Sequence, residues 1–277
     1  MINALLAINA DLASSIAFRY ACRLAEVIDM RLETIHIEAA AKEKFPPGSG
    51  WVRSTWEAGL LQSARETINQ LINTEKNECP ALGASIVRIG DREDELLGEI
   101  QKKSYDLLLE GILEDFDAHS FHQRIRSKLY RYAPCPIILV KNLAHPDRVA
   151  LLLQDAEDVV PVVSTFMRLF DPSKTAVAVC HCGFTTNGQA PSRINLADDP
   201  QAGEAAARRL IDDAVDLLAA NGWAPESRWI IRDRPKRIGA GLDDYGLVGA
   251  RMPLGGHDRG SFTDMLSRVP SATLLVN

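Results

Sequence analysis

The sequence lacks three features that would point to common classes of protein. No apolar run approaches the roughly 18 residues of a membrane-spanning helix. The net charge of -6 provides no basic surface of the kind that attracts nucleic acid, so we expect no DNA or RNA partner. No basic region precedes the first apolar stretch, which meets Asp11 too early for a secretory signal. These absences predict a cytoplasmic protein without a membrane span.

Cysteine is scarce, and its count is odd. Five cysteines in 277 residues are unlike the paired framework of a disulfide-rich fold. Only the Cys180-His181-Cys182 triplet invites a metal interpretation. On a strand, however, neighbouring side chains point to opposite faces, so His181 cannot share an ion with the two cysteines. We therefore expect no metal.

Motifs of nucleophilic catalysis are missing as well. The chain has no Gly-x-Ser-x-Gly elbow, no Walker loop and no readable set of nucleophile, base and orienting residue. His119 and His122 lie three positions apart, which on a helix places them on one side, but no third partner is identifiable. We predict that the protein is not an enzyme, with weak ATP hydrolysis as the alternative.

What the sequence does contain is an internal repeat. Apolar runs end at Asn9 and at Gln154, which are 145 positions apart (154 − 9). The next apolar segments lead to His36 and His181, at the same offset (181 − 36). Two landmarks with one offset argue for duplication. Later pairs lie closer, at offsets of 142, 138 and 136: Asp91/Asp233, Gly111/Gly249 and Val140/Val276.

Short apolar strands alternate with amphipathic helices in both halves. In the first half we predict strands at 4–8, 32–37, 84–89, 106–109 and 136–140, helices at 12–29, 61–72, 93–102 and 121–131, and a loop at 42–55. In the second half we predict strands at 149–153, 176–181, 228–231, 247–249 and 272–276, helices at 159–169 and 210–218, and a loop at 183–203. This alternation predicts α/β architecture, and the polar segment 142–146 divides the chain into domains 1–143 and 144–277.

These landmarks together resemble the universal stress protein family in its tandem form. The segment 131–140 closely matches the family's final helix-to-strand passage, and 87–91 matches its third strand and Gly-Asp turn. The resemblance implies two Rossmann-like domains of the adenine nucleotide alpha hydrolase type, each a five-stranded parallel sheet with helices on both faces. It also implies a nucleotide site at the carboxyl ends of the strands, where open α/β sheets bind ligands.

The resemblance also predicts how the domains assemble. In similar proteins the final strands pair across an interface, so we expect Ile137–Val140 and Thr273–Val276 to pair in an internal pseudo-dimer. Chains are expected to form homodimers as well.

The first domain departs from the family's ATP motif. That motif has an Asp at the end of the first strand and, after the fourth, Gly, two residues, Gly, nine residues, Gly and Ser/Thr. Here Asn9 replaces the Asp, Gly111 is in place, Glu114 stands at the second glycine, and Arg124-Ile125 falls on the final pair. Carboxylates facing phosphates cost several kcal/mol in a partly desolvated site, so we predict a degenerate site.

The second domain departs differently. Gln154 replaces the strand-ending Asp, and Met252 stands where the second glycine belongs. The glycine-rich stretch nevertheless offers backbone N–H groups and flanking Arg251, His257 and Arg259 to an anion, through Gly249, Gly255, Gly256, Gly260 and Ser261. A flexible loop with tight turns is the favoured interpretation.

Two further groups of residues are expected to have ordinary structural roles. The basic residues Arg124, Arg126, Lys128 and Arg131 are expected to form a solvated helix face. Trp51 and Trp56 are expected at the end of the first loop, packing over their own domain.

The sequence predicts a stress-response regulatory or binding protein with no cofactor, whose partner is an unidentified protein or small molecule. One alternative is ATP or AMP binding with slow hydrolysis at the second domain. Another is a carrier of a small or lipid-like molecule.

Overall fold

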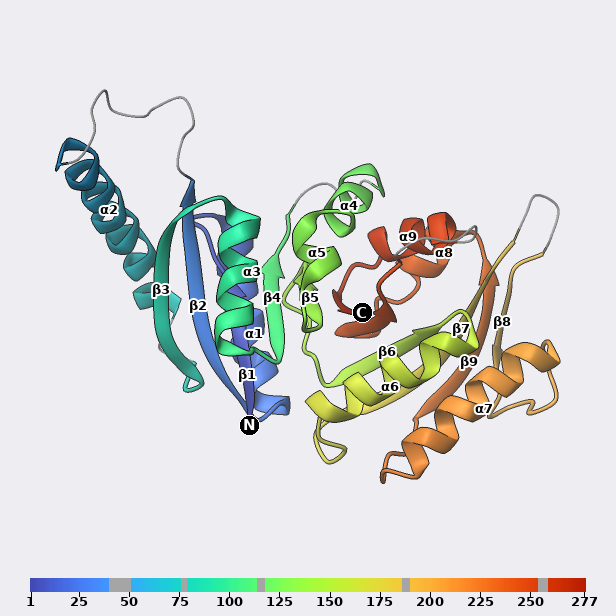
Figure 1. Ribbon diagram of the computed structural model, residues 1–277. Coiled ribbons are helices and arrows are strands. Elements are labelled where there is room, and N and C mark those ends of the chain that lie inside the picture. The colour runs from blue at the N-terminus through green and yellow to red at the C-terminus, as the bar shows by residue number, and fades with distance from the viewer. Residues whose placement is uncertain (40–50, 76–78, 114–117, 186–189, 254–258) are drawn as a thin grey trace.

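The computed structural model describes residues 1–39, 51–75, 79–113, 118–185, 190–253 and 259–277 (Figure 1). Over these ranges a single 11-stranded sheet runs through the molecule, in the order β3-β2-β1-β4-β5-β11-β10-β6-β7-β9-β8. None of the described helices is both long and apolar enough to cross a membrane.

Strands and helices alternate along the chain. The first half comprises β1 (Ile2–Ala7), α1 (Leu12–Val27), β2 (Met30–Ala39), α2 (Trp51–Glu75), β3 (Leu82–Gly90), α3 (Arg92–Lys103), β4 (Leu107–Gly111), α4 (Ala118–Ile125), α5 (Lys128–Tyr132) and β5 (Ile137–Val140). The second half comprises β6 (Arg148–Leu153), α6 (Ala156–Leu169), β7 (Ala176–Phe184), β8 (Ser192–Asn195), α7 (Ala205–Ala219), β9 (Ser227–Asp233), α8 (Pro235–Ala240), β10 (Leu247–Arg251), α9 (Arg259–Ser267) and β11 (Ala272–Val276).

The predicted α/β architecture is confirmed. Within each half the five repeated strands pair in parallel. Alternate strand residues enter two apolar clusters, as Leu5 and Leu6 of β1 do, because neighbouring side chains point to opposite faces. Helices α1, α2, α6 and α7 contribute to one cluster, and α3, α4, α5, α8 and α9 contribute to the other. Both faces of the sheet are therefore covered.

Three predicted segments differ in the structure. The expected loop 183–203 contains strand β8, which pairs antiparallel with β9, so the second half has a sixth strand. Helix α2 begins at Trp51, so Trp51 and Trp56 lie on a helix rather than at the end of a loop. The single helix expected at 121–131 is two helices, because a turn at Arg126 and Ser127 ends α4 before α5 begins.

The cysteine prediction also needs correction. A disulfide joins Cys22 of α1 to Cys79, which precedes β3. These residues are 57 positions apart in sequence, but their Cα atoms lie within 5.0 Å in the fold, and only that proximity decides pairing. Cys135, Cys180 and Cys182 are free and buried.

The repeat extends to individual hydrogen bonds. The Nδ1 atom of His36 lies 3.0 Å from the carbonyl oxygen of Ile8, and Nδ1 of His181 lies 3.1 Å from that of Leu153. Both partners are related by the offset of 145 found in the sequence (153 − 8). Each histidine thus ties the second strand of its half to the end of the first.

The two halves join through their final strands, as predicted. Strands β5 and β11 pair antiparallel, with Leu139 opposite Thr273. The residue after each strand then reaches across the junction: the amine of Lys141 donates to the carbonyls of Leu266 and Val269, each at 2.9 Å. The side-chain amide of Asn277, which follows β11, donates to the carbonyl of Ala133 in the first half at 2.7 Å.

Lys141 makes the stability of this junction depend on pH. Burial lowers the pKa of its amine to about 7, from 10.5 when exposed. Between these values the unfolded chain holds a proton that the folded chain lacks, so the free energy of unfolding increases as pH rises from about 7, by up to ~1.4 kcal/mol per pH unit. Denaturant titrations at pH about 7 and about 9 should show this increase in the wild type and lose it in Lys141→Met. Equal pH dependence in both proteins would contradict the burial of a neutral amine.

Candidate functional site

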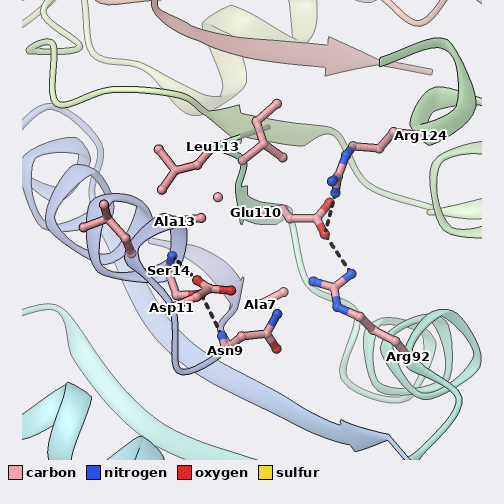
Figure 2. Close-up of a pocket in the computed structure, with 12 residues that line it drawn as sticks. Ala7, Asn9, Asp11, Ala13, Ser14, Arg92, Glu110, Leu113 and Arg124 are labelled. Atoms are coloured by element: carbon pink, nitrogen blue, oxygen red, sulfur yellow. Dashed lines mark hydrogen bonds and ion pairs between the residues drawn. The ribbon is translucent and has the colours of Figure 1, made fainter. Parts of the chain in front are cut away.

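A cavity of about 540 Å³ opens at the carboxyl ends of β1 and β4 (Figure 2). The sheet order changes direction at this point, since β1 lies between β2 and β4, and open α/β sheets bind ligands at such a position. The lining residues come from both strand ends and three helices: Ala7, Asn9, Asp11, Leu12, Ala13, Ser14, Arg92, Glu110, Gly111, Ile112, Leu113 and Arg124.

On the side of α1, the polar groups are held by one another. The Asp11 carboxylate caps the helix by accepting a hydrogen bond from the backbone N–H of Ser14 at 2.8 Å. The Ser14 hydroxyl in turn accepts from the backbone N–H of Asn9 at 2.7 Å. Asn9, the predicted replacement for the family's Asp, therefore does lie in the cavity wall, and its backbone N–H is already satisfied.

The opposite wall carries a buried carboxylate that the sequence analysis missed. Glu110 is the penultimate residue of β4 and is almost completely buried. Its Oε1 atom lies 2.7 Å from Nη1 of Arg92 and 3.2 Å from Nη1 of Arg124 (Figure 2). The Tyr130 hydroxyl donates to its Oε2 atom. A charged residue at the end of the apolar run 107–109 was the available signal.

This cluster changes the prediction made for Arg124. Arg124 was expected on a solvated helix face with three other basic residues, but from α4 its side chain reaches Glu110 in the cavity. The other three, Arg126, Lys128 and Arg131, are exposed as predicted. Burial, followed by the adjacent Glu110 charge, raises the pKa of Tyr130 well above its ordinary value, so the phenol remains a hydrogen-bond donor.

The cavity has no formal charge surplus. Arg92 and Arg124 contribute two positive charges, and Asp11 and Glu110 contribute two negative ones, among its lining residues. Arginine guanidiniums are suited to bind phosphate, but here both are paired with one carboxylate. The lining as a whole is therefore neutral, while the cluster of Arg92, Arg124 and Glu110 carries one net positive charge.

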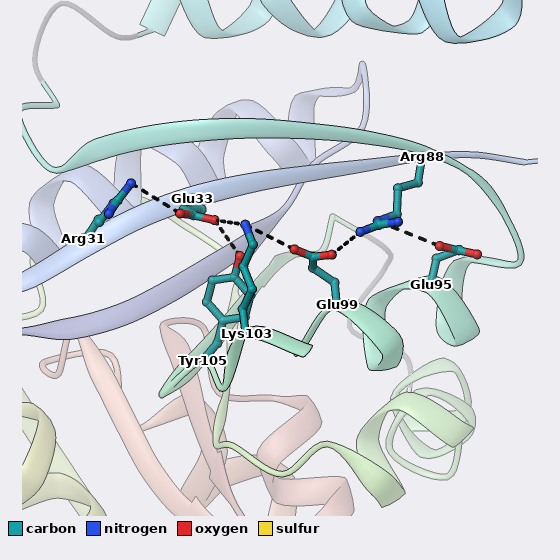
Figure 3. A network of polar contacts seen from close by, with 7 residues as sticks. All are labelled: Arg31, Glu33, Arg88, Glu95, Glu99, Lys103 and Tyr105. Carbon is teal, nitrogen blue, oxygen red and sulfur yellow. Dashed lines mark hydrogen bonds and ion pairs between the residues drawn. The ribbon is translucent and has the colours of Figure 1, made fainter. Parts of the chain in front are cut away.

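Helix α3, which presents Arg92, is fixed by a polar network on the outside of the first half (Figure 3). The buried Glu99 carboxylate pairs with Arg88 of β3 and lies 3.3 Å from the Lys103 amine. That amine is also 2.9 Å from Glu33 of β2, which accepts a hydrogen bond from Tyr105 at 2.6 Å. The Tyr105 hydrogen bond, and then that of Lys103, lowers the pKa of Glu33. The network holds α3 against two strands.

Gly111 ends β4 for a steric reason. A Cβ atom at this position would lie 2.2 Å from the carbonyl oxygen of Ala13 and 3.0 Å from Cβ of Ala17. The first turn of α1 therefore lies directly against the end of β4. A side chain at this position is therefore excluded by the protein's own backbone.

The second half contradicts the predicted alignment of Gly249 with Gly111. Gly111 pairs with Val140 at the end of β5, whereas the residue that pairs with Val276 at the end of β11 is Arg251. Gly249 lies two positions earlier, inside β10, where an added Cβ would meet Leu151 at 3.0 Å. The offset of strand β4 to β10 is therefore 140 (251 − 111) rather than 138.

Arg251 consequently occupies the strand end where a phosphate-binding glycine was expected. Its guanidinium lies 3.3 Å from Glu157 and 3.7 Å from Asp158, at the start of α6. Asp158 also accepts a hydrogen bond from the backbone N–H of Gln154 at 2.9 Å. The backbone N–H of Gln154, a predicted site residue, is thus hydrogen-bonded to the first turn of α6.

The remaining predicted residues are divided. Gly260 and Ser261 lie in the first turn of α9, and an added Cβ on Gly260 would meet open space. Gly255, Gly256 and His257 lie outside the described residues, as does Glu114. Of the predicted set, the cavity brings together Asn9, Gly111 and Arg124. No group of three or more metal-ligating side chains occurs within the described ranges.

Comparison with known proteins bears on the fold. No family model and no curated protein matches the sequence. Among solved structures, a universal stress protein from Archaeoglobus fulgidus DSM 4304 matches with a TM-score of 0.61 at 10% identity, over 99% of this chain and 95% of its own. A functionally unknown protein from Pseudomonas aeruginosa PAO1 matches with a TM-score of 0.56 at 16% identity, over 99% and 92%.

A third structure, of a proposed universal stress protein from Pseudomonas aeruginosa UCBPP-PA14, matches with a TM-score of 0.54 at 15% identity, again over 99% of this chain and 92% of that one. At these identities the likeness establishes the fold. The chain has the Rossmann-like fold of tandem universal stress proteins over its whole length, as its sequence motifs predict.

Proposed function

We propose that this protein is a tandem universal stress protein that acts by binding, as a regulator in a stress response, and that its first half does not bind ATP in the manner of the ATP-binding members it resembles. The observation that carries the proposal is the Glu110 carboxylate, held beside Gly111 by Arg92, Arg124 and Tyr130.

Charge is the first reason. A triphosphate brings several negative charges and needs a surplus of cations or N–H donors to accept them. The two arginines of the cavity are balanced by Glu110 and Asp11. Because Glu110 is buried and accepts from Arg92, Arg124 and Tyr130, turning it away would break all three of these contacts, which costs several kcal/mol.

Packing is the second reason. Gly111 is held by the first turn of α1, which leaves no room for a side chain at this strand end. At the equivalent strand end of the second half, Arg251 replaces a glycine and pairs with two carboxylates. The second strand end therefore lacks the glycine that the ATP motif has there.

A protein that binds a partner without catalysing a reaction needs no reactive thiol, and the free cysteines agree with this. Burial raises the pKa of Cys135 and of Cys180 to about 12, and that of Cys182 well above its ordinary value. A buried thiol that stays protonated is a poor nucleophile.

We further propose that the division into domains falls at residues 143 and 144, and that chains associate as homodimers. The internal pairing of β5 with β11 already uses the two final strands. A homodimer therefore needs a different surface, and the partner of the protein is a further protein or a small molecule.

Native mass spectrometry of freshly purified protein, with and without Mg-ATP, tests the proposal. We expect no nucleotide adduct on the wild type. An adduct that persists in Gly260→Leu and disappears in Arg124→Gln would place ATP in the first half and overturn the proposal. Gly260 is suited to this comparison because the space around it accommodates a side chain.

The same experiment separates the alternatives. An adduct lost in Gly260→Leu but kept in Arg124→Gln would favour nucleotide binding in the second half. A co-purifying mass that is not a nucleotide would favour a carrier of small molecules.

A further inference from the structure

A second cavity, of about 310 Å³, lies in the second half. It is at the carboxyl end of β9, near the edge of the sheet, and not at the switch point. It is enclosed by the edge strand β8, the end of β9, and helix α8. Its lining residues are Pro191, Ser192, Arg193, Ile231, Arg232, Asp233, Arg237, Ile238 and Gly241. The described residues of the first half contain no counterpart of β8, so this cavity belongs to the second half alone.

Strand β8 presents the first cation of the cavity. In the antiparallel pairing of β8 with β9, Arg193 lies opposite Ile231, so the two side chains share a face of the sheet. The Arg193 guanidinium carbon is 4.6 Å from the centre of the Trp229 ring, two residues along the same face. Contact with an aromatic face orients the guanidinium. Its N–H groups lie at the edge of the guanidinium plane, where they can still donate to a ligand.

Helix α8 presents the second cation. An added Cβ on Gly239 would lie 2.2 Å from the carbonyl oxygen of Met265, so α8 packs closely on α9 through this glycine. Two helical residues are about 200° of rotation, so Arg237 projects from the side opposite this contact. Arg237 is exposed, and no described residue forms an ion pair with it.

The floor between the two arginines is apolar and rigid. Ile231 and Ile238 are buried in the core cluster of this face, with 7% and 2% of their surfaces exposed. The cavity therefore combines a cationic rim with an apolar base, the arrangement that holds a small ligand by its body and fixes it by a few polar groups.

Charge distinguishes this cavity from the first. Three arginines and one aspartate line it, a formal surplus of two positive charges on a chain whose net charge is -6. Glu204 pairs with Arg232 at 2.7 Å and reduces the surplus to one. Asp233 is engaged by the backbone N–H of Arg234 at 2.7 Å. Arg193 and Arg237 remain as the cations directed to a ligand.

We propose that this cavity binds a small organic anion that carries phosphate or carboxylate groups, with Arg193 and Arg237 clamping the anionic groups and Ile231 and Ile238 contacting the body. Pockets of roughly 300–1,000 Å³ hold small-molecule ligands, so its volume suits a small metabolite rather than a macromolecular segment. The site is independent of the first-half cavity and of whether that cavity binds ATP.

Calorimetric titration of the full chain with inorganic pyrophosphate and with citrate tests this assignment. We expect saturable binding of at least one probe, with one site per chain. Arg237→Gln should weaken it about tenfold or more, because a charge-assisted hydrogen bond is lost. Arg237→Lys should recover part of the affinity. Pyrophosphate alone would identify phosphate as the recognised group, and citrate alone would identify carboxylate.

Arg234→Gln is the matched control, since Arg234 is an exposed arginine three residues away that does not line the cavity. It should bind as the wild type does. The assignment would be overturned by the absence of saturable binding to both probes, or by equal weakening in Arg234→Gln and Arg237→Gln. As a local readout, binding should change the emission of Trp229, and Trp229→Phe should remove that change.

Discussion

Replacing Gly111 by alanine is expected to lower the free energy of unfolding by about 3 kcal/mol. The added Cβ would lie 2.2 Å from the carbonyl oxygen of Ala13 and 2.7 Å from its carbonyl carbon. Both are backbone atoms of the first turn of α1, so no side-chain rotation relieves the clash. Either β4 or α1 must therefore move. Both contribute to one apolar core cluster, and β4 also pairs in parallel with β1.

Gly98→Ala provides the control for this change. Gly98 lies within α3, and an added Cβ there would meet no atom within 4 Å. Alanine is a better helix former than glycine by about 1 kcal/mol, so this variant should be slightly more stable than the wild type. Chemical denaturation of the three proteins measures the difference. A Gly111→Ala variant within about 0.5 kcal/mol of the wild type would show that Gly111 is not fixed by packing.

The sequence predicted the order of the five repeated strands in each half because it depends on local periodicity, whereas the junction of the halves was predicted from the family resemblance. Apolar patterning located β1, β6 and β11 to within about two residues. The shared offset of Asn9/Gln154 and His36/His181 correctly matched the first two strands of one half with those of the other. In both halves a histidine of the second strand forms the same hydrogen bond to the end of the first strand.

Local patterns in the sequence could not show how β4 of the first half corresponds to β10 of the second. Gly111 and Gly249 were aligned because both are glycines after an apolar run, but a glycine inside a strand and one at its end look alike in sequence. Only the pairing with β5 and β11 shows that Arg251, not Gly249, ends β10. Alignment by residue type failed because sheet register is decided by neighbouring strands.

Long-range contacts explain the other omissions. Glu110, Arg92 and Tyr130 are separated by up to 38 positions (130 − 92) and meet only when β4, α3 and α5 pack. Strand β8 is four residues long within a polar segment, and an edge strand of that length has little apolar pattern of its own. Each feature depends on tertiary contacts that no local window contains.

Glu110→Gln is expected to destabilise the protein by about 2–3 kcal/mol. The substitution keeps the shape of the side chain but removes the charge that compensates Arg92 and Arg124. Breaking a fully buried pair costs more, about 3–5 kcal/mol, but these arginines keep 36% and 24% of their side chains exposed and recover part of the loss from water. The free energy of unfolding from urea titration is the measurement.

Glu226→Gln is the control, because Glu226 pairs with Arg148 at 2.8 Å with 34% of its side chain exposed. Surface pairs of this kind contribute about 0–1 kcal/mol, so the control should cost less than Glu110→Gln. Equal losses would indicate that water reaches Glu110 and that the cluster is not desolvated. A larger loss at Glu110 is the expected result and would show that the buried cluster depends on its charge.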